Sequence, residues 1–243
     1  AMPRRACRLR SSRLPYDQTQ FFEAHMPVKA VLAAARAEGV TLTSWLGARL
    51  MLAVYAELPL LERRRPVAVS LPVNLRNYYP SETARNFFNS IRVAQQLPGR
   101  ETPASLAASF DAALKTELSE ERVKARMDGF ERFERLPFVK PVPLVVKNRV
   151  VAAVTHFQER YTTATLSNLG VIKTPPELAP WLRGFAAMSS TSNLFACVCS
   201  WQEDLVVCLS SAYRSTGVPR RLFSGIAAEG IEVTLYANEV VTG

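Results

Sequence analysis

The pattern of apolar and polar positions predicts helices in the first half of the chain. A helix is predicted from Pro27 to Gly39, because apolar residues recur there on one face at helical spacing. A second helix is expected after a cap at Thr41 or Thr43, and it is apolar nearly all round, so it should lie deep in the fold. A third helix is predicted over residues 104–133.

Alternating or short apolar runs bounded by turn residues predict strands, most of them late in the chain. The predicted strands are residues 67–71, 89–96, 161–166, 185–190, 194–201, 205–211 and 231–236. Between them, residues 138–154 predict a short loop and a helix that packs on the sheet, and residues 219–229 predict a closing helix. This order favours one layered α/β unit over alternating parallel repeats.

Composition and charge fit a folded domain with a basic beginning. The 243 residues are 48% hydrophobic and 21% charged, which excludes general disorder. The net charge is +9, but five arginines fall in the first thirteen residues, leaving 25 basic residues against 21 acidic ones elsewhere. We therefore divide the chain into an extended basic leading segment, residues 1–26, and a subdomain, residues 27–243. The segment is interpreted as a solvated arm or as a part that packs against absent sequence. A nucleic-acid role is disfavoured because no aromatic residues interleave with the arginines.

The four cysteines do not predict a metal site, because they show no Cys-x-x-Cys spacing and no nearby histidines. They are expected to be buried free thiols in a reducing, cytoplasmic compartment. The arginine-rich start lacks the apolar core of a signal peptide, and no uncharged apolar run approaches the roughly 20 residues of a membrane span.

The most informative stretch is residues 67–91. A strand ends there in Pro-Val-Asn-Leu-Arg, and Arg-Asn-Phe-Phe follows about ten residues later. Pro72 and Pro80 exclude a helix, so an ordered loop carrying Arg76 and Asn86 is predicted. This stretch resembles the middle of the chloramphenicol-acetyltransferase-like superfamily, which includes alcohol acetyltransferases and the condensation domains of peptide synthetases.

The resemblance covers about residues 28–236 and implies only half of such an enzyme. Members consist of two similar halves, and the first carries the catalytic base in a His-x-x-x-Asp-Gly motif. This chain contains only His25 and His156, and neither is followed by that Asp-Gly. The resemblance therefore implies the C-terminal half, without the base, and a two-layer α/β sandwich with a mixed, largely antiparallel sheet.

The resemblance gives Arg76 and Asn86 supporting roles. In these enzymes the arginine pairs with the aspartate of the histidine motif, a contact for which the planar guanidinium is well suited. Asn86 is expected to brace the backbone of the loop. Without the family, an arginine after a strand would be interpreted as a surface or capping charge.

A second group of candidate residues lies in the sequence Thr-Leu-Ser-Asn-Leu-Gly, residues 165–170. By itself it predicts a strand end with a glycine turn. Similar segments of the family lie where the two halves meet, so Thr165 or Ser167 is expected to support the oxyanion. Asn168 would line the acyl tunnel, and Gly170 would let the backbone approach the substrate.

Residues 210–217 take the place that the histidine motif has in the first half. They contain a Ser-Ser pair but neither histidine nor aspartate, so a serine nucleophile is excluded. His25 and His156 are interpreted as packed or surface residues.

The predicted function is that of the C-terminal half of an acyl-CoA-dependent O- or N-acyltransferase of the alcohol acetyltransferase type. Its partners would be the missing N-terminal half, an acyl thioester and an alcohol or amine acceptor. No bound cofactor is expected, acyl-CoA being a co-substrate. The chain alone should be inactive, and its uncovered apolar face should favour self-association. The alternatives are a condensation domain, whose donor is held on a carrier protein, and a non-catalytic binding module.

Overall fold

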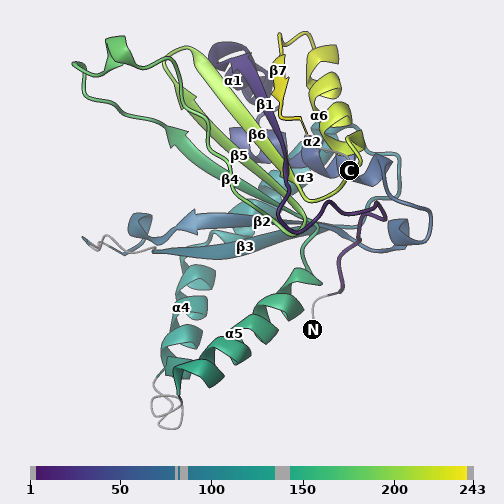
Figure 1. Cartoon of the computed structure of the whole chain (residues 1–243), viewed down its shortest axis with the longest axis vertical. Coiled ribbons are helices and arrows are strands. Elements are labelled where there is room, and N and C mark those ends of the chain that lie inside the picture. The colour runs from purple at the N-terminus through teal and green to yellow at the C-terminus, as the bar shows by residue number, and fades with distance from the viewer. Residues whose placement is uncertain (1–3, 80–81, 83–86, 135–142, 240–243) are drawn as a thin grey trace.

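The computed structural model describes residues 4–79, 82, 87–134 and 143–239. Within these residues, seven strands form one sheet in the order β3-β2-β4-β5-β6-β1-β7 (Figure 1). The strands are β1 Gln20–Pro27, β2 Val67–Asn74, β3 Phe88–Gln95, β4 Ala164–Val171, β5 Leu194–Trp201, β6 Asp204–Ser211 and β7 Thr234–Ala237. Only β4 runs parallel to its neighbours, β2 and β5, and the other neighbouring pairs are antiparallel. The predicted mixed, largely antiparallel sheet is confirmed.

Helices cover one face of this sheet and give the two-layer architecture. The described helices are α1 Val28–Ala37, α2 Leu42–Ala56, α3 Pro103–Glu117, α4 Glu120–Glu134, α5 Leu144–Glu159 and α6 Gly217–Ala228. The central one is α2, which contacts α3, α6 and the sheet and buries its side chains nearly all round, as its sequence predicted. A Cβ at Gly47 would come within 2.5 Å of the Phe110 ring, so α3 approaches α2 this closely only over glycine.

The cap of α2 is Thr41, not Thr43. The Oγ1 atom of Thr41 accepts a hydrogen bond from the backbone N–H of Ser44 at 3.2 Å. Asp111 of α3 reinforces this end, because its Oδ1 atom accepts from the Ser44 hydroxyl at 2.7 Å and from the Thr41 N–H at 3.3 Å. The start of α2 is therefore fixed both by its own sequence and by a residue of the packed neighbour.

Several predicted elements end or lie differently. The helix predicted over residues 104–133 is divided into α3 and α4, and residues 185–190 form no strand. The helix α5 extends away from the sheet together with α4 (Figure 1), and Val145, Val146 and Val150 on it are exposed. The prediction that this helix packs on the sheet is wrong, because the helix points away from the sheet and these three valines do not face the core.

The basic leading segment is packed against the subdomain itself. Cys7 is fully buried, and its N–H donates to the carbonyl of Pro66 at 2.9 Å, while the N–H of Leu14 donates to Ala212 at 2.9 Å. Arg10 pairs with the buried carboxylate of Glu62 at 2.9 Å. The end of this segment is strand β1 of the sheet, so the chain before residue 27 is not a solvated arm.

Membrane-spanning helices are absent from the described part of the chain, where none is both long and apolar enough to cross a bilayer.

Candidate functional site

The side chains of β4 divide between the two faces of the sheet. Ala164 and Leu166 point into the core under the helices. Since side chains alternate along a strand, Thr165 and Ser167 point to the opposite face. The predicted hydroxyl donors thus share one face, the one that the helices leave uncovered.

The two hydroxyls differ in their partners. Ser167 hydrogen-bonds to the thiol of Cys197 on β5; burial raises the pKa of that thiol, and the hydrogen bond only partly offsets the effect. Among the described residues, the hydroxyl of Thr165 hydrogen-bonds to none. Thr165 is therefore available to a ligand, while Ser167 already has a structural bond.

Asn168 and Gly170 build a bulge at the end of β4. The pairing of β4 with β5 shifts between these two residues, and the Oδ1 atom of Asn168 accepts the N–H of Gly170 at 2.8 Å. Gly170 has a φ of +73°, a region that glycine adopts without steric cost. The Nδ2 atom of Asn168 donates to Thr43 of α2 at 3.0 Å, so this side chain lies toward the helices. The structure does not bring Asn168 together with Thr165 and Ser167.

Arg76 lies in a 3₁₀ turn, Leu75–Asn77, directly after β2. Its N–H donates to the Oδ1 atom of Asn74 at 3.0 Å, and its side chain is exposed at the surface. The turn therefore comes from the Asn74 side chain, and it places the guanidinium outside the core. Asn86 lies outside the described part of the chain, so its role in the loop stays a prediction.

A polar pocket of about 330 Å³ lies beside Thr165. Ser70 of β2 contributes to it, because Ser70 and Thr165 are partners across the parallel β2–β4 pairing. The remaining wall comes from the end of α5 with the residues after it and from residues 190–194 before and at the start of β5. Sequence reasoning missed this pocket, since its lining residues come from three separate stretches.

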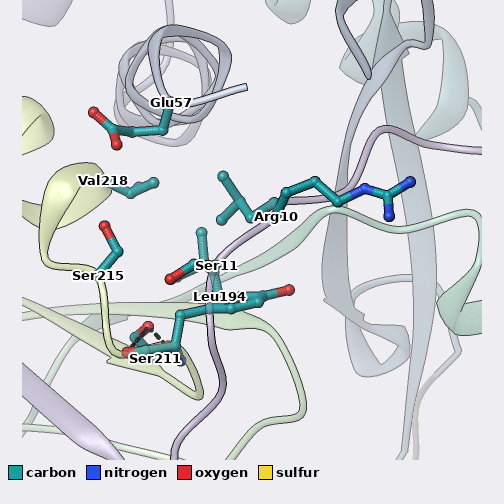
Figure 2. A pocket seen from close by; sticks show the side chains of 9 residues that line it. Arg10, Ser11, Glu57, Leu194, Ser211, Ser215 and Val218 are labelled. Atoms are coloured by element: carbon teal, nitrogen blue, oxygen red, sulfur yellow. Dashed lines mark hydrogen bonds between the residues drawn. The ribbon is translucent and has the colours of Figure 1, made fainter. Parts of the chain in front are cut away.

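Within residues 210–217, Ser211, Tyr213 and Ser215 help to line a second pocket, of about 200 Å³ (Figure 2). Ser211 is fully buried, and its Oγ atom accepts the N–H of Tyr213 at 3.1 Å. Glu57, whose carboxylate lies on the other side of the pocket, pairs with Arg221. No histidine lines this space, and its carboxylate is engaged by Arg221 while the Ser211 hydroxyl bonds to the backbone, so the arrangement is not that of an activated serine.

His25 is held between two carboxylates. Its Nδ1 atom lies 2.7 Å from Oδ2 of Asp204, and its Nε2 atom lies 2.8 Å from Oε1 of Glu23. Burial lowers the pKa of His25, but the hydrogen bonds to both carboxylates outweigh this effect and raise it. The imidazole thus links β1 to β6, with both nitrogens occupied by carboxylates. The expectation for the side chain of His156 lies outside the described part of the chain.

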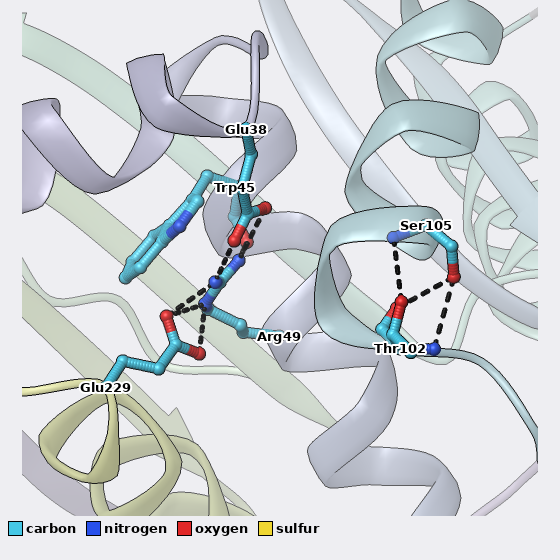
Figure 3. A network of polar contacts seen from close by, with 6 residues as sticks. All are labelled: Glu38, Trp45, Arg49, Thr102, Ser105 and Glu229. Atoms are coloured by element: carbon cyan, nitrogen blue, oxygen red, sulfur yellow. Dashed lines mark hydrogen bonds and ion pairs between the residues drawn. The ribbon is translucent and has the colours of Figure 1, made fainter.

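A buried ion network joins α1, α2 and α6 (Figure 3). Arg49 is only 5% exposed, and its Nη2 atom lies 2.5 Å from Glu38 and 2.6 Å from Glu229. Its guanidinium also lies 3.7 Å from the centre of the Trp45 ring. Sequence reasoning missed this network, because Arg49 and Glu229 are 180 residues apart. Its role is to hold the helical layer together.

The cysteine thiols and the possible metal ligands decide whether nucleophilic or metal-dependent chemistry is available. All four cysteines are free and buried, and burial raises the pKa of Cys7 to about 11 and that of Cys208 to about 12. These thiols stay protonated at neutral pH and are poor nucleophiles. Within the described residues, no group of three histidines, cysteines or carboxylates could hold a metal ion.

Comparison with known proteins identifies the fold. No family model matches the chain, and no curated protein matches its sequence. Among solved structures, the nonribosomal peptide synthetase FmoA3 matches 93% of this chain with a TM-score of 0.62 at 15% identity, over 22% of its own length. A wax ester synthase/diacylglycerol acyltransferase from Marinobacter aquaeolei VT8 matches 92% with a TM-score of 0.54 at 12% identity, over 51% of its length.

The epimerization domain from the third module of tyrocidine synthetase B gives the same picture. It matches 92% of this chain with a TM-score of 0.53 at 12% identity, and the match takes up 50% of its length. The chain thus spans about half, or less, of the structures it matches. Its fold is therefore similar to about half, or less, of each of these structures.

Proposed function

We propose that the chain is the C-terminal half of an acyl-CoA-dependent O- or N-acyltransferase. The observation that carries this proposal is the match of nearly the whole chain to half of an acyltransferase. In the complete enzyme, a histidine on the other half takes the proton of an acceptor hydroxyl or amine. The acceptor then attacks the thioester carbonyl, and coenzyme A leaves as the thiol.

Thr165 is the residue of this half that we assign to the oxyanion. It faces away from the helices, and its hydroxyl hydrogen-bonds to no described residue, so it can donate to the negative oxygen of the tetrahedral intermediate. Ser167 lies on the same face but is bonded to Cys197. Gly170 would give the substrate access to the backbone. Asn168, which bonds to Thr43, would support the end of β4 at the edge of the acyl tunnel.

Arg76 is assigned to holding the segment that bears the base. Its exposed position after β2 allows its guanidinium to meet a carboxylate on the other half, through two parallel hydrogen bonds. Asn86 would support the same loop. Replacement by lysine should be damaging in the complete enzyme, because an ammonium cannot reproduce the two-pronged contact.

The test compares Thr165→Val with Ser167→Ala in the complete two-half enzyme. Thr165→Val keeps the side-chain shape and removes the hydroxyl, so turnover should fall about a hundredfold. Ser167→Ala should keep most of the turnover, because it loses only the bond to Cys197. The reverse order of the two variants would transfer the oxyanion role to Ser167.

A condensation domain is the second candidate, and the match to a nonribosomal peptide synthetase favours it. The chemistry is the same, but the thioester is held on a carrier protein. Assays of the complete protein with an acyl-CoA and with the same acyl group on a carrier protein would separate the two. A complete protein that transfers neither would support a binding module.

A further inference from the structure

The pocket beside Thr165 is lined mainly by polar residues. We call it the hydroxyl pocket and define it by Ser70, Thr162, Thr165, Ser190, Ser192 and Glu159, which all line it. Its two apolar lining residues, Ala164 and Leu194, are almost fully buried. Small-molecule sites are usually lined by apolar groups, so this pocket is unsuited to an acyl chain.

Most of its hydroxyls are not used by the protein. Within the described residues, the hydroxyls of Ser70, Thr162, Thr165 and Ser190 form no hydrogen bond. The exceptions are Ser192, whose hydroxyl donates to Oε1 of Glu159 at 2.9 Å, and Thr191, which also lines the pocket and whose Oγ1 atom accepts the N–H of Asn193 at 3.1 Å. Each hydroxyl can both donate and accept, so a ligand with many hydroxyls finds partners in either sense.

Glu159 adds an acceptor at the side of the pocket. A carboxylate oxygen can accept more than one hydrogen bond, so Glu159 can accept from a ligand hydroxyl in addition to its other contacts. Ser192 fixes the orientation of this carboxylate by its hydrogen bond.

The location connects the pocket to the proposed reaction. Ser70 and Thr165 face one another across β2 and β4, whose spacing in a sheet is about 4.8 Å. A ligand in the pocket therefore lies against the hydroxyl that we assign to the oxyanion. The volume of about 330 Å³ is in the range of small-molecule sites and large enough for one six-membered ring with its hydroxyls.

We propose that the hydroxyl pocket binds a polyhydroxylated acceptor of the sugar or cyclitol class and presents one of its hydroxyls for acylation. This inference rests on the proposed function, because it names the acceptor of that same site. Binding itself needs only the residues of this chain.

The test measures binding of myo-inositol and of cyclohexanol to the 243-residue chain by saturation-transfer NMR titration. The two probes share a six-membered carbon ring and differ in having six hydroxyls or one. We expect saturable binding of myo-inositol and at least tenfold weaker binding of cyclohexanol, since neutral hydrogen bonds to several hydroxyls are lost.

Variants locate the binding site without touching Thr165. The double variant Ser70→Ala/Thr162→Val should weaken myo-inositol binding about tenfold, because two hydroxyl partners are removed. The matched control is Ser224→Ala, an exposed hydroxyl on α6 outside the pocket, and it should change nothing. Circular dichroism shows whether the double variant is folded. If it is not, the single variant Ser190→Ala, which removes another hydroxyl of the pocket, replaces it in the binding measurement.

Three results would overturn the inference: no binding of myo-inositol, equal binding of cyclohexanol, or binding that Ser70→Ala/Thr162→Val leaves unchanged. The proposed function fails separately. If the complete enzyme acylates simple alcohols while this chain ignores myo-inositol, only the polyol inference is wrong. If this chain binds myo-inositol in the pocket but the complete protein transfers no acyl group, the acyltransferase proposal is wrong and the pocket assignment stands.

Discussion

Arg49 is the residue on which the helical layer depends most. Its guanidinium is buried, contacts carboxylates of two other helical segments and covers the face of Trp45. Removing one partner of a buried ion pair leaves charge without compensation, which is far more costly than losing a surface pair.

Arg49→Ala should therefore lower the free energy of unfolding by about 3 kcal/mol, since Glu38 and Glu229 are left facing each other. Urea denaturation gives the value. The control is Arg220→Ala, an exposed arginine of α6, which should change stability by less than about 0.5 kcal/mol. If Arg49→Ala lowered the free energy of unfolding as little as Arg220→Ala, the network would contribute no stability.

Gly170 lies at the end of β4, and Gly184 serves as a control for the effect of a glycine-to-alanine change on stability. A Cβ would meet open space at both positions, but only Gly170 has a positive φ, of +73°. Gly170→Ala should cost about 1–2 kcal/mol, because alanine is strained in the left-handed region. Gly184→Ala should be neutral or slightly stabilising. Thermal unfolding distinguishes the two, and a neutral Gly170→Ala would mean that the bulge relaxes at no cost.

Among the elements, β1 is attached to its neighbours by a titratable clamp. His25 on β1 bonds to Asp204 at the start of β6, and Tyr236 of β7 lies edge-on at 5.6 Å between ring centres. Glu23, on the same face of β1, occupies the second nitrogen. The imidazole of His25 therefore contacts residues of β6, β1 and β7, the last three strands in the order of the sheet.

The clamp predicts a pH dependence of stability. The folded pKa of His25 is raised above its unfolded value, so the charged form is favoured by folding. This contribution is fully present below about pH 6.5 and is lost as the pH rises through the folded pKa. The free energy of unfolding, measured by urea denaturation from pH 5.5 to 9, should fall with a step that is absent in His25→Asn. A step of equal size in the variant would assign it to another group.

Sequence patterns predicted the helices and strands more accurately than they predicted the contacts between them. Strands such as β5 and β6 follow from their apolar runs and the turn at Gln202. Residues 185–190 look like a strand, yet Phe185 instead packs as part of a cover over Cys199 and Val206. The local sequence pattern indicates that a segment is buried, but it does not indicate which neighbouring segment buries it.

The candidate site was predicted only in part for the same reason. That Thr165 and Ser167 share a face follows from alternation along β4. The bond of Ser167 to Cys197, the turn of Asn168 toward Thr43 and the hydroxyl pocket all depend on residues distant in sequence. Such pairings are set by the tertiary fold, and the spacing of residues within one segment carries no information about them.

At the scale of the whole molecule, one sheet face is covered by helices and the other bears the candidate oxyanion residue. The matched structures are about twice as long or longer, and this sequence contains no His-x-x-x-Asp-Gly motif. Under the proposed function, activity therefore requires a second half.

The most direct measurement is thioester-dependent acyl transfer by this chain alone and by the complete two-half protein, with an acyl-CoA and an acyl-carrier protein as donors. The account predicts no turnover by the chain alone, transfer by the complete protein, and about a hundredfold loss of that transfer in Thr165→Val. Turnover by the isolated chain that a point change within it abolishes would contradict the account.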